Sequence, residues 1–128
     1  AREYSNGDYW QVHRLTVDTY ALQHPGKQDS RAIQSVNVHL ASLYLIFKKK
    51  FNNSQATKAI GKLIKQRKAC FVYLERPPSF EQLNVLNIWK AENTNQHLTL
   101  VKKWAEATFD AWHQHHKYID ALLRGACL

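Results

Sequence analysis

Residues 33–47, IQSVNVHLASLYLIF, decide the fold, because the stretch is apolar almost all round after its first turn. Its β-branched and aromatic residues would also suit a β-strand, but fifteen residues without a turn signal suit a helix better. A helix that is hydrophobic on every side has to be buried. We therefore predict a central helix here, with Asp29 or Ser30 as its N-cap.

Three other segments carry apolar residues at helical spacing, and we expect their helices to pack around the central one. They are residues 8–23, 55–74 and 95–124, and each is followed by a proline or glycine that stops a helix. Residues 75–92 begin with a Pro-Pro break and are expected to form a short helix or an ordered loop. The sequence thus predicts an all-α fold, an up-and-down bundle of four main helices with this additional element before the last one.

Length and composition bound the organisation of the protein. With 128 residues, of which 45% are hydrophobic, residues 1–128 are predicted to form a single helical domain. The chain contains no Met, even at position 1, so we expect a natural N-terminal segment to be missing. No stretch resembles a transmembrane span or a signal peptide, which predicts a cytoplasmic protein without a membrane partner. Cys70 and Cys127 have neither metal-ligand nor disulfide-framework spacing and are expected to be ordinary thiols.

Three of the predicted helices each bring a histidine to a face that should be buried, namely His13, His39 and His116. Helical bundles build metal sites from side chains on facing helices, and neutral imidazole is a frequent ligand of zinc, nickel and iron. We therefore predict a histidine-lined metal or small-molecule site, with these three residues as the metal ligands and with Asp18 or Tyr20 orienting them. If the protein is an enzyme, such a site favours metal-assisted hydrolysis or transfer. The alternative for each histidine is a structural role, in which the imidazole hydrogen-bonds a backbone carbonyl or a tyrosine.

His39 has the best argument for burial, because apolar residues flank it on both sides in the central segment. Its own helix face carries the small residues Ala32, Ser35 and Ser42. Small neighbours leave room for a ligand or for a closely packed helix. The sequence therefore places the predicted site around His39.

Two other classes of function stay open at this point. The net charge of +8 and the lysines of residues 48–50 and 55–74 favour a basic binding module for nucleic acid or an acidic partner. The remaining hypothesis is a non-catalytic, self-associating bundle, a homodimer whose interface would include Trp10 and Trp89. Catalysis without a metal has little support, because the chain contains no nucleophile elbow and no phosphate-binding glycine loop.

Residues 13–26, HRLTVDTYALQHPG, resemble the signature of a small bacterial family known only as a domain of unknown function. Residues 35–43 (SVNVHLASL), residues 75–80 (ERPPSF) and residues 104–116 match the same family, so the resemblance spans nearly the whole chain. It implies an uncharacterised bacterial protein without an assigned activity. The predicted layout is also similar to that of the DinB-like metal-dependent helical bundles, in which three histidines from different helices surround a divalent ion.

Overall fold

The computed structural model describes residues 6–78 and 94–125, and the regular structure in these two ranges is helical throughout. Five α-helices and two short 3-10 helices follow one another along the described chain. They are α1 (Asn6–Gln23), α2 (Ser30–Phe47), α3 (Asn53–Arg67), η1 (Lys68–Cys70), α5 (Thr94–Ala111), η2 (His113–His115) and α6 (His116–Leu123). Because these ranges contain no strand, the predicted all-α class is confirmed.

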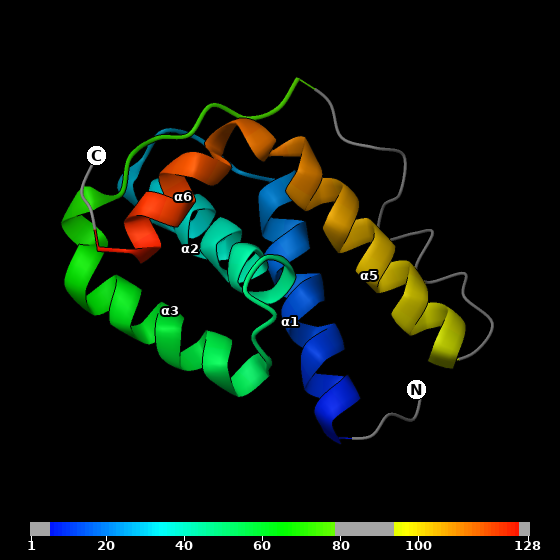
Figure 1. Ribbon diagram of the computed structural model, residues 1–128. Helices are drawn as coiled ribbons and strands as arrows, with labels where there is room; N and C mark the ends of the chain where they lie inside the picture. Colours follow the sequence, from blue (N-terminus) through cyan, green and yellow to red (C-terminus); the bar gives the residue numbers. More distant parts are fainter. Residues whose placement is uncertain (1–5, 79–93, 126–128) are drawn as a thin grey trace.

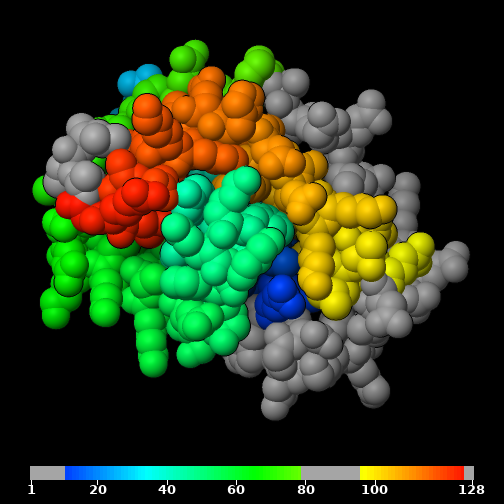
Figure 2. Space-filling model, in the orientation of Figure 1, coloured from blue at the N-terminus to red at the C-terminus, as the bar shows by residue number. Residues whose placement is uncertain are grey.

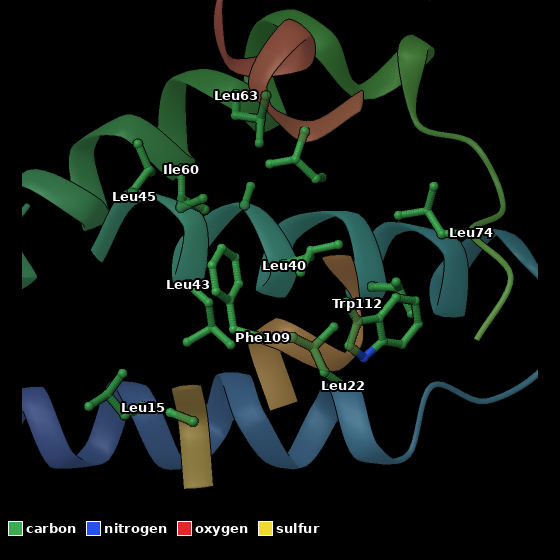
Figure 3. Close-up of a cluster of buried hydrophobic side chains, with 14 of the residues drawn as sticks. Leu15, Leu22, Leu40, Leu43, Leu45, Ile60, Leu63, Leu74, Phe109 and Trp112 are labelled. Atoms are coloured by element: carbon green, nitrogen blue, oxygen red, sulfur yellow. The ribbon is translucent and has the colours of Figure 1, made fainter. Parts of the chain in front are cut away.

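Helix α2 is the centre of the arrangement. It contacts α1, α3, α5 and α6, and α3 and α5 lie at opposite sides of it (Figure 1). Figure 2 shows its C-terminal end filling the space between α3, α5 and α6. In Figure 3, Leu43 lies with Phe109 on the side of α2 that faces α1, whereas Leu45 lies with Ile60 on the side that faces α3. A helix that is buried on two sides needs the nearly continuous apolar sequence from which it was predicted.

Side-chain caps fix where α2 and α3 begin. The Asp29 carboxylate accepts a hydrogen bond of 2.8 Å from the backbone N–H of Ala32, as one of the two predicted N-caps. Before α3, Asn52 and Gln55 form a capping box, in which each side chain accepts the backbone N–H of the other at 2.8 and 2.9 Å. These caps satisfy N–H groups that have no partner within the helix.

The predicted helix over residues 55–74 ends early, and the chain leaves the helical path after Cys70. The Asn37 side chain on α2 donates a hydrogen bond of 2.8 Å to the carbonyl oxygen of Val72. The Tyr118 hydroxyl on α6 lies between the Asn37 amide oxygen and the Cys70 carbonyl oxygen, at 2.5 and 3.1 Å. The backbone here bonds to side chains of two other helices instead of continuing its own, and local periodicity carries no sign of such distant partners.

The predicted last helix, residues 95–124, is split at Trp112 into α5 and α6. The carbonyl oxygen of Phe109 accepts hydrogen bonds of 3.1 Å from the backbone N–H of Trp112 and 2.8 Å from the His116 Nε2, so this backbone group is satisfied at the break. Apolar residues at helical spacing are buried on both sides of the break, among them Val101, Phe109 and Ile119. The short helix or loop expected before this helix falls largely on residues 79–93, outside the described ranges.

Helix α1 turns a different face to the core from the one predicted. Val12, Leu15 and Leu22 are buried, whereas Val17 and Tyr20 are 44% and 51% exposed. Apolar residues occur on both faces of α1, so their spacing alone did not define one stripe. The contacts with α2 and α5 decide which face is covered.

The structure also bears on the predictions about the cysteines, the lysines and a membrane span. Cys70 is disulfide-bonded, so the prediction of an ordinary thiol is wrong for it, and Cys127 lies outside the described ranges. Lys48, Lys49 and Lys50 are exposed, as a basic face requires, and nucleic-acid binding stays a prediction. Within the described residues, no helix combines the length and the hydropathy that a membrane span needs.

Candidate functional site

The Asp18 carboxylate is a buried polar group between α1 and α2, with the residue only 4% exposed. Its Oδ1 lies 2.7 Å from the His39 Nδ1, and its Oδ2 accepts a hydrogen bond from the Ser42 hydroxyl. His39 and Ser42 are three residues apart on α2 and therefore lie on one face of that helix, within reach of one carboxylate. The two hydrogen bonds occupy both oxygens of Asp18.

The Arg14 guanidinium extends this network to α3. It donates hydrogen bonds of 2.7 Å to the Asn53 Oδ1 and 2.9 Å to the Ser42 hydroxyl, and a third to the Thr57 hydroxyl. An arginine four residues before an aspartate on a helix would ordinarily pair with it. Here Arg14 reaches Asp18 only through Ser42, and three neutral acceptors hold its charge in place. The network thus joins α1, α2 and α3 at one point.

A cavity of about 380 Å³ opens beside this network. It is lined by His13, Arg14, Val17, Asp18, Val38, His39, Ser42, Asn53, Thr57 and Ile60. A cavity of this size falls within the range of small-molecule sites in proteins. Its wall combines apolar side chains with a few fixed polar groups, which is the usual composition of such sites.

The hydrogen bond to Asp18 fixes the chemistry of the His39 imidazole. A carboxylate accepts but does not donate, so the His39 Nδ1 carries the proton of this hydrogen bond. In the neutral ring the Nε2 then carries the lone pair. No described residue donates a hydrogen bond to the Nε2, and the His39 side chain is 23% exposed. The arrangement presents an oriented imidazole that can accept a proton.

The predicted metal ligands do not come together as expected. His13 is exposed rather than buried, although it lines the same cavity as His39. His116 lies elsewhere, stacked on Phe109 with ring centroids 4.0 Å apart. Among the residues that the structure describes, no group of three or more His, Cys, Asp or Glu side chains could hold a metal ion. The three-histidine metal site therefore finds no support in this structure.

Of the two residues predicted to orient the three histidines, Asp18 bonds to one of them, whereas Tyr20 contacts a different histidine. Asp18 holds His39, whereas the exposed Tyr20 ring stacks on His24, with centroids 4.3 Å apart. The small residues Ser35 and Ser42, expected to leave space beside His39, both line cavities that His39 also lines. The space was therefore predictable from α2 alone.

No comparable indication in the sequence pointed to Arg14, Asn53 and Thr57. Asn53 and Thr57 lie in the first turns of α3, where polar residues are common because they cap helices. One weak signal was present, because Arg14 and Asp18 are oppositely charged residues four apart in α1. Their partners on α2 and α3 could not be inferred from that spacing.

His116 gives a prediction about the pH dependence of folding. Burial lowers the pKa of the His116 imidazole below its ordinary value of 6.5, more than the hydrogen bond to the Phe109 carbonyl raises it. The unfolded chain then binds this proton more readily than the folded protein does, so stability falls as the pH drops below 6.5 and levels off below the folded pKa. We expect urea unfolding at pH 7.5 and 5.5 to show this loss in the wild type and a smaller one in His116→Gln. An equal loss of stability in the wild type and in His116→Gln would contradict this prediction. The control is His113→Gln, because His113 is exposed.

The amino-acid sequence was compared with those of known protein families. The profile of a family of unknown function, DUF5946, matches residues 1–113 of the chain. The match includes every residue that lines the cavity beside Asp18 and His39. No curated protein and no solved structure matches the chain significantly.

Proposed function

The chain belongs to DUF5946, a family of unknown function, so its role has to be inferred from the site itself, and we propose that the site is a general-base centre for a small polar molecule. In this proposal the molecule binds in the cavity between α1, α2 and α3. His39 accepts a proton from it at the Nε2. Asp18 orients the imidazole and stabilises its charged form. The observation that carries the proposal is the 2.7 Å hydrogen bond between the Asp18 Oδ1 and the His39 Nδ1 beside that cavity.

The proton transfer can be followed atom by atom. A hydroxyl or an activated carbon of the bound molecule loses its proton, and the bond forms at the His39 Nε2 lone pair. The Nδ1 proton stays in its hydrogen bond to Asp18, so the positive charge of the imidazolium is balanced by the carboxylate. Arg14 is placed to stabilise the negative charge that develops on the substrate, because three of its five N–H donors are engaged and two remain.

A ligand screen by NMR tests this proposal without a known substrate. We expect fragments with an acidic hydroxyl to shift the amide signals of Val17 and Val38, which line the cavity. His39→Ala should weaken the binding of these fragments by about tenfold, because it removes the acceptor of one hydrogen bond. The control is His113→Ala, because His113 is exposed on η2 and lines none of the cavities described here. Fragments that bind His39→Ala as tightly as the wild type would contradict the proposal.

The same samples decide between a base and a metal ligand. A metal ion that binds only the folded state raises the melting temperature. If Zn²⁺ or Ni²⁺ raises it in the wild type but not in His39→Ala or His13→Ala, these two histidines hold a metal and the general-base role is overturned. If neither ion changes the melting temperature, the result agrees with the proposal, which requires a His39 Nε2 that binds no metal ion.

A further inference from the structure

His39 lines a second cavity, of about 480 Å³, in addition to the one beside Asp18. Val38 is the other residue common to both cavities. The second cavity is lined by Ser30, Arg31, Gln34, Ser35, Val38, His39, Ile64 and Lys68. Most of these residues lie three or four apart along α2, so they form one face of that helix. His39 therefore stands where the two cavities meet.

The second cavity has a positive charge that nothing in its lining offsets. Arg31 and Lys68 are its cations, and none of its lining residues is acidic. Neither cation forms an ion pair in the described part of the chain. The nearest acidic residue along the sequence, Asp29, is engaged with the backbone N–H of Ala32 as an N-cap. The first cavity differs, because Asp18 forms part of its wall.

We propose that the molecule on which His39 acts carries a phosphate group, and that this group binds between Arg31 and Lys68. Two cations together favour a dianion over a monoanion. The hydroxyls of Ser30 and Ser35 and the amide of Gln34 add neutral donors for phosphate oxygens. The reacting end of the molecule then lies in the neighbouring cavity, beside the His39 Nε2. The assignment to a substrate rests on the general-base role of His39, whereas phosphate binding itself does not.

Titration with inorganic phosphate at constant ionic strength tests the anion site. We expect phosphate to shift the amide signals of Ser35 and Gln34. The double variant Arg31→Gln, Lys68→Gln should weaken binding by about tenfold or more, because it removes both charge-assisted contacts to the phosphate. The matched control is Lys58→Gln, Lys65→Gln, which removes the same charge from exposed positions of α3 that line no described cavity.

The outcomes separate a specific site from the general attraction of a chain with net charge +8. Equal weakening in both double variants would overturn the proposal, because only net charge would then matter. Acetate that binds as tightly as phosphate at the same residues would overturn the preference for a dianion. If phosphate still binds to His39→Ala, and fragments bind this variant as tightly as the wild type, the anion site remains supported and only the general-base role is lost.

Discussion

Replacing Phe109 with alanine is expected to lower the free energy of unfolding by about 3–5 kcal/mol, the range for removing a buried aromatic side chain. Phe109 on α5 is 1% exposed, and its ring lies 4.0 Å from His116, 5.6 Å from Phe47 and 6.2 Å from Tyr44, measured between centroids. The ring therefore contacts both the C-terminal end of α2 and the start of α6. Removing it leaves a cavity and also exposes the stacked imidazole. Urea unfolding followed by circular dichroism measures the loss.

Two further variants show whether the loss comes from the core. Phe109→Leu keeps most of the apolar volume and should cost less than half as much as the alanine variant. Tyr73→Ala removes an aromatic ring that is 44% exposed and should change stability by no more than about 0.5 kcal/mol. If Phe109→Ala cost as little as Tyr73→Ala, the aromatic cluster would not be the centre of the core.

The central helix was predictable because its evidence lies within the helix itself. Residues 33–47 are apolar on nearly all sides, and only burial on two sides suits such a sequence. The all-α class follows from the same kind of evidence in the other helices. The up-and-down order of the helices stays a prediction, since periodicity says which face is apolar and not which helix covers it.

Two features that sequence reasoning missed depend on contacts between helices. The break at Trp112 has no glycine or proline to mark it, and the His116 ring supplies a second donor to the Phe109 carbonyl there. The burial of Asp18 is a similar case. Asp18 is acceptable in the interior only because His39 and Ser42, more than twenty residues along the chain, supply two donors.

For the site, the sequence led to His39 and to one of its two predicted partners but misplaced the other histidines. His13 was assigned to the buried face of α1 because apolar residues stand one turn on either side of it. His116 was expected to face inward, and it does so only in part, toward Phe109 and not toward His39. Helical spacing indicates a face, but it does not give the height or direction at which two faces meet.

Replacing Asp18 with alanine is expected to lower the free energy of unfolding by about 2–4 kcal/mol, because breaking a buried pair leaves its partners unsatisfied. The His39 Nδ1 and the Ser42 hydroxyl would lose their acceptor. The Ser42 hydroxyl would then no longer be held in the orientation in which it accepts the hydrogen bond from Arg14. Urea unfolding measures the change. Asp110→Ala removes a carboxylate that is exposed and should change stability by no more than about 0.5 kcal/mol.

The isosteric variant Asp18→Asn separates structural support from the proposed proton transfer. The asparagine amide fills the same space and still accepts one hydrogen bond, so we expect it to recover part of the stability lost in Asp18→Ala. An amide both donates and accepts, however, so it no longer forces the proton onto the His39 Nδ1. Nitrogen NMR shifts of His39 should therefore show a single Nδ1–H tautomer in the wild type and a mixture of tautomers in Asp18→Asn. If both proteins show the same mixture, Asp18 fills space between α1 and α2 without setting the state of His39, and the site loses its oriented base.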